Sequence, residues 1–229
     1  MKKLYLLLVL PFLLSLTSCG NGKEIDVNKA KEIYESIEEY TKGFKGGDYT
    51  KVLTSHSEIV DDGVEEVYDI YNLIERKGTT VHNYYKNKNH GNKKESEVYY
   101  YEKNGEYFQN DSKLMKLQYE SLIASYNSLG LASSYLSFVD IYISACLKGT
   151  ELGVTTFYSK GEGNLTVVQV LDVKNKEETY YSKTTYTYND YKFVYYEFES
   201  EKKEADGDLE KQYRTESVKY KASFRNPYK

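Results

Sequence analysis

The chain has 229 residues, of which 31 are basic and 35 acidic, and its formal net charge is −4. This acidic balance argues against a nucleic-acid-binding protein, because such binding depends on cations placed against phosphates. The length suits a single domain.

Residues 1–18 have the three parts of a secretory signal. Lys2 and Lys3 precede an apolar segment at residues 4–14, and small or polar residues follow up to Ser18. The apolar segment is too short to span a bilayer, which takes about 20 residues. We therefore expect residues 1–18 to be removed and the protein to be exported. Loss of the two lysines makes the net charge −6, which disfavours electrostatic adhesion to anionic lipid.

Leu16-Thr17-Ser18-Cys19 is similar to the bacterial lipobox, in which a branched apolar residue and two small residues precede a cysteine. The resemblance implies cleavage after Ser18 and a diacylglycerol on the Cys19 sulfur. It therefore implies a protein tied to the outer face of the bacterial cell membrane by a covalent lipid on Cys19. The alternative is an ordinary signal peptide that leaves Cys19 as an unpaired thiol, which would be a liability in an exported protein.

Residues 19–25 form a short tether, and a single domain is predicted from residue 26 to residue 229. Asp26 is a suitable N-cap, and apolar residues recur at helical spacing behind it until glycines at positions 43, 46 and 47. These apolar residues are Val27, Ala30, Ile33, Tyr34, Ile37, Tyr40 and Phe44. We predict an amphipathic helix whose apolar stripe needs a sheet or another helix to cover it.

Residues 48–77 are ambiguous between helix and strand. Residues 48–59 suit a strand, whereas the apolar residues of 64–74 match helical spacing behind Asp62 as a cap. The strand propensity of the segment VYDIYNLI competes with this spacing. We favour a helix for the second half.

After Gly78 the pattern turns to strands. The segments TTVHNYY and ESEVYYYEK are predicted to pair across a long polar loop, KNKNHGNKK. Asn104-Gly105, a favoured two-residue hairpin turn, leads into a third strand, EYFQ.

Residues 114–147 return to helical spacing on both sides of Gly130. The first predicted stripe is Leu114, Leu117, Leu122, Tyr126 and Leu129, and the second is Tyr135, Phe138, Val139, Tyr142, Ile143 and Cys146. We predict an apolar αα-hairpin that lies in the core or against a sheet face. Cys146 is explained there as a small buried apolar residue.

From residue 151 onwards, strands joined by turns dominate. Predicted turns lie at residues 160–163, 174–176 and 189–190, and KKEADGDLEK forms a charged loop. Residues 213–224 then alternate apolar and polar, as in a strand with one buried face. The predicted fold is α+β: a curved antiparallel sheet, a half-barrel-like meander, packed on the N-terminal helix and the central αα-hairpin.

This order of elements behind a lipobox resembles the LolA-like half-barrel superfamily, which includes lipid-carrying lipoproteins of the bacterial envelope. In that superfamily a curved antiparallel sheet wraps helices and leaves an apolar cavity for acyl chains. The resemblance covers residues 25–225 and implies a non-enzymatic binder of lipid or another hydrophobic ligand. It carries over no ligand-binding residue.

Catalytic, metal and cofactor sites are not predicted. His56, His82 and His90 lack the spacing of a helical zinc motif. Residues 206–208 (Asp-Gly-Asp) lack the further oxygens of a calcium loop. Residues 161–163 (Gly-Glu-Gly) suit a hairpin turn better than a phosphate loop, and the chain has no G-x-S-x-G nucleophile motif.

Runs of tyrosine offer an alternative function. The chain holds 27 tyrosines, and consecutive tyrosines in a strand point to opposite faces. The runs are Tyr99, Tyr100 and Tyr101, then Tyr180 and Tyr181, then Tyr195 and Tyr196. One face fills a core and the other presents aromatic rings to water, although an A+T-rich genome also explains the abundance of tyrosine. The alternative is therefore a surface lipoprotein that binds a protein or glycan partner through an exposed Tyr-rich sheet.

Overall fold

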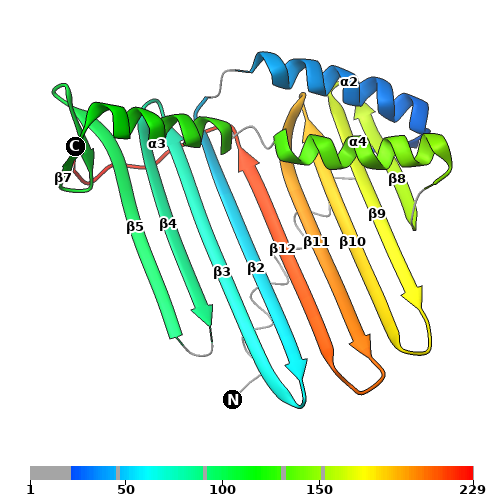
Figure 1. Ribbon diagram of the computed structural model, residues 1–229. Helices are drawn as coiled ribbons and strands as arrows, with labels where there is room; N and C mark the ends of the chain where they lie inside the picture. The colour runs from blue at the N-terminus through cyan, green and yellow to red at the C-terminus, as the bar shows by residue number, and fades with distance from the viewer. Residues whose placement is uncertain (1–21, 45–46, 90–91, 130–132, 151–152, 229) are drawn as a thin grey trace.

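The computed structural model describes residues 22–44, 47–89, 92–129, 133–150 and 153–228. Within these ranges the chain forms three helices and one 12-stranded antiparallel sheet (Figure 1). The helices are α2 (Val27–Gly43), α3 (Lys116–Leu129) and α4 (Ser133–Lys148). The strands are β1 (Lys23–Ile25), β2 (Tyr49–Asp61), β3 (Val64–Lys77), β4 (Thr80–Asn89), β5 (Asn92–Lys103), β6 (Glu106–Gln109), β7 (Ser112–Leu114), β8 (Val154–Gly161), β9 (Asn164–Lys174), β10 (Glu178–Asn189), β11 (Lys192–Glu204) and β12 (Leu209–Lys219).

The sheet has the order β1-β8-β9-β10-β11-β12-β2-β3-β4-β5-β6-β7. β12 pairs with β2 in the middle of the sheet, with Tyr213 opposite His56, so the two halves of the chain form one surface. The sheet stays open, and its two edge strands, β1 and β7, have three residues each. The predicted α+β fold, a curved half-barrel-like antiparallel meander with an N-terminal helix and a central pair of helices, is confirmed.

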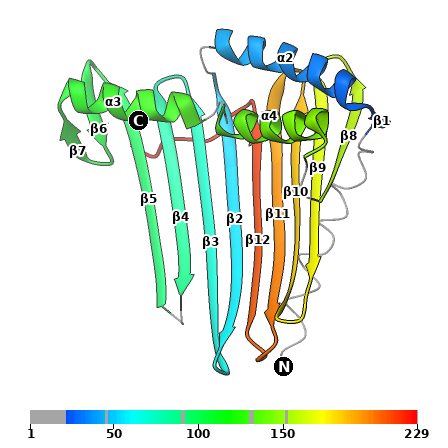
Figure 2. The same cartoon turned by 45° about the vertical axis from the view of Figure 1, so that its right-hand side comes forward.

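All three helices cover the same face of the sheet, near one end of the strands (Figures 1 and 2). α2 and α4 lie over the half that contains β8 to β11, and α3 lies over the half that contains β3 to β5. The core fills the layer between them and the sheet, with Ile37, Val139, Ile143 and Val167 at most 1% exposed. We call this side the helix face and the opposite side the outer face.

Helix α2 agrees with the prediction. The Asp26 carboxylate caps it by accepting from the backbone N–H groups of Asn28 and Lys29, at 2.9 and 3.0 Å. Its buried residues are Ala30, Ile33, Tyr34 and Ile37, which belong to the predicted stripe. Spacing and capping therefore suffice to locate this helix.

The helix favoured within residues 62–77 is wrong, because this segment forms β3. β2 and β3 join through a two-residue turn in which Asp62 and Gly63 have φ angles of 48° and 76°. Asp-Gly is a preferred pair for such a turn because both residues tolerate positive φ. The strand propensity of the segment and its long register with β2 outweigh the helical spacing.

The predicted pair of apolar helices is present, but the buried stripes differ from the predicted ones. In α3 the buried residues include Tyr119, Ile123 and Tyr126, whereas Leu117 is 77% exposed. In α4, Leu136, Val139 and Ile143 are buried, whereas Phe138 is 48% exposed. Each helix has apolar residues on more than one face, so periodicity alone does not identify the buried face.

The strands continue well beyond the helices into charged segments that the sequence predicted as loops. β4 runs to Asn89 and β5 begins at Asn92, which pairs with it, so the described residues of the loop expected at 86–94 belong to strands. β11 likewise extends to Glu204, and β12 begins at Leu209. None of the described helices covers this part of the sheet (Figure 2), so polar side chains suit both sides of each strand.

The last strand is shorter than predicted. β12 ends at Lys219, and residues 220–228 cross towards β4 and β5 without regular structure (Figure 1). We call residues 220–228 the C-terminal strap. Its aromatic residues contact other elements instead of pairing as a strand, Tyr220 with the Phe44 ring and Phe224 with the His82 ring.

Candidate functional site

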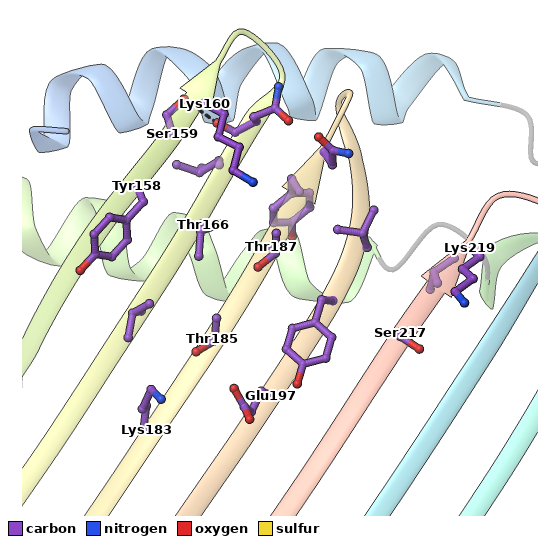
Figure 3. Close-up of a pocket in the computed structure, with 18 residues that line it drawn as sticks. Tyr158, Ser159, Lys160, Thr166, Lys183, Thr185, Thr187, Glu197, Ser217 and Lys219 are labelled. Carbon is purple, nitrogen blue, oxygen red and sulfur yellow. Dashed lines mark hydrogen bonds between the residues drawn. The ribbon is translucent and has the colours of Figure 1, made fainter. Parts of the chain in front are cut away.

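A groove of about 550 Å³ lies on the outer face, over β8 to β12 (Figure 3). In β10, Tyr186 is buried on the helix face, and Thr185 and Thr187 stand on either side of it in the strand. Thr185 and Thr187 must therefore point to the outer face, because successive side chains of a strand alternate. We call this feature the outer-face groove.

One row of side chains crosses the groove from strand to strand. The pairing places Tyr158 opposite Thr166, Thr166 opposite Thr187, Thr187 opposite Tyr195, and Tyr195 opposite Ser217. Two phenol rings thus flank a floor of two threonines, and Ser217 lies on the far side of Tyr195. Three interstrand spacings separate the two tyrosines, about 14 Å.

The charge of the groove is opposite to that of the chain. Three lysines line it, Lys160, Lys183 and Lys219, against one carboxylate, Glu197. Lys183 also forms an ion pair with Glu199 at 3.9 Å, in which the two side chains are 36% and 40% exposed. An acidic protein therefore presents a locally basic groove.

Tyr195 keeps its phenolic proton well above neutral pH. Burial, followed by the nearby Glu197 carboxylate, raises the pKa of Tyr195 to about 12. The ring therefore offers a neutral apolar face and a hydroxyl in the groove. This suits stacking and hydrogen bonding rather than acid–base catalysis.

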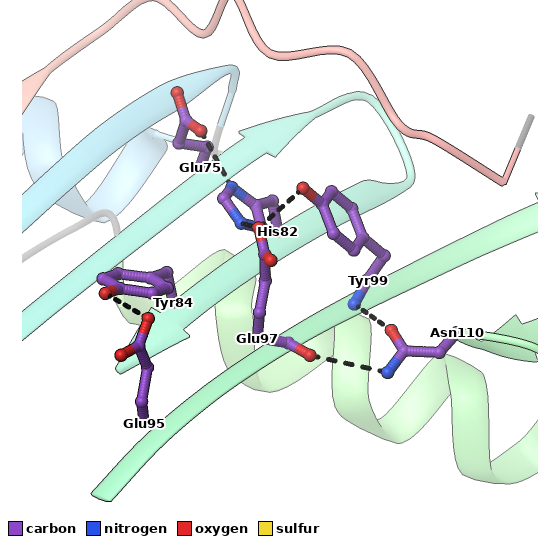
Figure 4. Close-up of polar contacts among 7 residues, drawn as sticks. All are labelled: Glu75, His82, Tyr84, Glu95, Glu97, Tyr99 and Asn110. Atoms are coloured by element: carbon purple, nitrogen blue, oxygen red, sulfur yellow. Dashed lines mark hydrogen bonds and ion pairs between the residues drawn. The ribbon is translucent and has the colours of Figure 1, made fainter. Parts of the chain in front are cut away.

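A second polar cluster surrounds His82 on the outer face of β4 (Figure 4). His82 is 8% exposed, and its Nδ1 and Nε2 lie 2.9 Å from carboxylate oxygens of Glu75 and Glu97 respectively. The Tyr99 hydroxyl donates to the same Glu97 oxygen at 2.9 Å. Phe224 of the C-terminal strap packs on the imidazole, with ring centroids 5.8 Å apart. This contact holds the strap against β4, and the strap in turn covers the cluster.

A buried ion pair lies on the helix face, at the centre of the sheet. The Glu216 carboxylate has an exposed fraction of only 3% and contacts the Lys51 ammonium at 2.8 Å. The Tyr135 hydroxyl donates to its other oxygen at 3.1 Å. Burial and the Glu216 charge raise the pKa of Tyr135 above its ordinary value. Nothing in the sequence spacing marks this cluster, because pairing of β12 with β2 creates it.

Two carboxylates of one turn and one carboxylate of another turn lie together in the structure, and local spacing in the sequence did not indicate this. Asp61 and Asp62, at the β2–β3 turn, lie beside Asp208, at the β11–β12 turn, with one oxygen from each within 4.8 Å of the others. The Asp62 N–H also donates to the Asp208 carboxylate at 3.1 Å. Exposed acidic groups commonly lie together in this way, so the geometry alone assigns no metal.

The remaining predicted residues have separate surroundings. His56 makes an exposed contact with Asp69 at 2.7 Å, and His82 belongs to the cluster above. His90 and the predicted lipid attachment site, Cys19, lie outside the described residues. Cys146, which was predicted to be buried, is partly buried next to the core.

The tyrosine runs divide between the two faces as alternation requires. Tyr196 stacks on Tyr135 of α4 on the helix face, whereas Tyr195 lines the outer-face groove. Tyr100 joins the core, whereas Tyr101 lies under Tyr228 of the strap. The groove itself was not predicted, because its lining spans five strands. The only local sign of it is the spacing of Lys183, Thr185 and Thr187 on one face of β10.

No protein-family model matches the chain, and no curated protein matches it in sequence. A solved structure of an S-type phycobiliprotein lyase, CPES from Guillardia theta, overlays with a TM-score of 0.19 and 8% identity, over 83% of this chain and 94% of that chain. A score this low supports no argument about fold or function. Among the described residues, no helix is both long and apolar enough to cross a bilayer.

Proposed function

We propose that this protein is an exported lipoprotein, anchored by Cys19, that binds an anionic, hydroxyl-rich ligand such as an acidic glycan in the outer-face groove. The observation that carries the proposal is the row from Tyr158 to Ser217, with three lysines around it. Aromatic rings stack on the apolar faces of sugars, the hydroxyls exchange hydrogen bonds, and the lysines attract acidic substituents. The function is binding without catalysis.

The ligand site proposed here differs from the one that the LolA-like resemblance implied. In that superfamily the cavity lies between the sheet and the helices. In this chain buried residues such as Ile37, Val139 and Val167 occupy that layer. We therefore favour the alternative, a ligand bound on an open face of the sheet.

The test compares an acidic with a neutral polysaccharide on the purified protein, using hyaluronan and dextran. We expect hyaluronan to bind and dextran to bind at least about tenfold more weakly, a difference of about 1.4 kcal/mol. Lys160→Gln combined with Lys219→Gln should reduce hyaluronan binding about tenfold or more. Lys113→Gln, which removes an exposed lysine of β7 paired with Glu106, is the matched control and should change nothing. Equal binding of the two polysaccharides, or no effect of the groove variants, contradicts the proposal.

A further inference from the structure

A second pocket, of about 660 Å³, lies at the C-terminal end of α2. The last two turns of α2 contribute Glu39, Tyr40 and Gly43, and the β8–β9 and β10–β11 turns contribute Glu162 and Tyr191. The two turns are held together by the Tyr191 N–H, which donates to the Gly163 carbonyl at 2.8 Å. The pocket wall is therefore fixed by backbone contacts. We call it the helix-end pocket.

Aromatic rings form one wall of the helix-end pocket. The Tyr40 ring stacks against Tyr191, with centroids 5.5 Å apart, and against Phe44, with centroids 5.9 Å apart. One cation of the chain already contacts this wall, since the Lys192 ammonium lies 5.8 Å from the Tyr40 centroid. The π-electrons of such rings attract ammonium groups.

Negative charge faces the same space. The carboxylates of Glu39 and Glu162 line the pocket, and the basic group beside it is Lys192, at the Tyr40 ring. The Tyr191 hydroxyl donates to Glu162 at 2.6 Å, and this hydrogen bond raises the pKa of Tyr191, so the phenol stays neutral. The C-terminal end of α2 adds the negative end of a 17-residue helix. Rings, carboxylates and helix end all favour a cation.

We propose that the helix-end pocket binds an organic ammonium group, such as the choline moiety of a lipid headgroup or of a free small molecule. The ammonium lies between the carboxylates of Glu39 and Glu162 with its alkyl groups against Tyr40 and Tyr191. A bulky, weakly hydrated ammonium fits better than a small metal cation, because aromatic faces attract weakly hydrated cations and the Tyr191 hydroxyl already occupies one Glu162 oxygen. This site is independent of the ligand proposed for the outer-face groove.

The probe is choline chloride, titrated into the ¹⁵N-labelled full-length lipoprotein in maltoside micelles, with sodium chloride at equal ionic strength as the reference. We expect saturable amide shifts at Gly43, Phe44 and Tyr191, with a dissociation constant on the order of 1 mM. A second arm places the protein in phosphocholine micelles without added choline. The same shifts there identify a lipid headgroup as the source, and their absence there, with choline still binding, identifies a free ammonium compound.

Two variants test the pocket from different directions. Glu39→Gln combined with Glu162→Gln should weaken choline binding at least tenfold. Gly43→Leu should abolish it, since a Cβ at Gly43 meets no atom within 4 Å and the added side chain enters open space. The matched control is Glu35→Gln, which removes an exposed α2 carboxylate paired with Lys31 at 3.8 Å and should bind choline normally. Shifts that sodium chloride reproduces, or binding that survives both pocket variants, overturn the proposal.

Discussion

The His82 imidazole stacks on the Tyr99 ring, with centroids 4.4 Å apart and planes 12° from parallel. This stack places both imidazole nitrogens against carboxylates and lets Phe224 of the C-terminal strap close the cluster. One histidine thus joins two neighbouring hairpins to the end of the chain. Its removal should affect the strap as well as the sheet.

We expect His82→Ala to lower the free energy of unfolding by about 3 kcal/mol, because it leaves the mostly buried Glu75 carboxylate without its partner. The matched variant is His56→Ala, which removes the exposed His56–Asp69 contact and should cost less than about 1 kcal/mol. Urea unfolding measures both. Equal losses would mean that burial of the His82 cluster does not determine its contribution.

The Lys51–Glu216 pair allows a second stability prediction. Lys51→Met should cost about 3–5 kcal/mol, because it leaves a carboxylate that is only 3% exposed without its cation. Combining it with Glu216→Gln should recover part of that loss, since a neutral amide costs less to bury than a charge. Lys29→Met, which breaks the exposed Lys29–Glu32 pair, should change stability by about 1 kcal/mol or less. Thermal and urea unfolding of the four proteins form the test, and a double variant no more stable than Lys51→Met contradicts it.

The orientation of α3 can be tested with two apolar residues. Ile123→Ala should cost about 2–4 kcal/mol, because Ile123 is 8% exposed in the core. Leu117→Ala should stay within about 0.5 kcal/mol, because Leu117 is 77% exposed. The sequence pattern placed Leu117 in the buried stripe, so the two interpretations predict opposite orders of stability.

The elements that the sequence predicts well are those whose local signals agree. In helix α2 the cap at Asp26, the apolar spacing and the glycines that follow all indicate the same bounds, so both ends follow from the sequence. At β3 the helical spacing and the strand propensity conflict, and pairing with β2, which a local pattern does not contain, decides the outcome. The charged ends of β4 and β5 were predicted as a loop because polar residues on both faces are unusual in a covered sheet. They form strands because β4 pairs with β3 and β5 up to Asn89, and no described helix covers this part of the sheet.

The candidate sites depend on strand pairing even more than the individual helices and strands do. Tyr158 and Ser217 enter the same groove only because four strand pairs bring β8 and β12 within reach. Glu162 and Tyr191 meet through two turns that the sequence predicted separately. Residues with reactive or charged groups could therefore be identified from the sequence. Which of them lie together in the fold could not be predicted from it.

Alkaline pH should unfold the protein through tyrosines whose ionisation the fold opposes. Burial is the main cause that raises the pKa of Tyr49 and of Tyr99 to about 12, against about 10 in an unfolded chain. Above pH 10 the unfolded state therefore loses these protons first. The contribution of the two phenols to the free energy of unfolding is fully present below pH 10 and is lost as the pH rises towards 12. Absorbance at 295 nm should show delayed ionisation followed by a cooperative step that coincides with loss of the circular dichroism signal. Smooth titration of all tyrosines near pH 10 in the folded protein would contradict this.

The lipid anchor is the remaining prediction, and it bears on how the sheet meets its surroundings. Cys19 precedes β1 by only four residues, which span at most about 14 Å. A lipid on Cys19 would therefore hold the β1–β8 edge, which carries Tyr158 and Lys160 of the outer-face groove, close to the membrane. Cys19→Ala should release the protein from the membrane fraction and abolish metabolic labelling with palmitate. Cys146→Ala is the matched control and should leave both unchanged. Retention of Cys19→Ala in the membrane fraction with palmitate still incorporated would disprove the anchor.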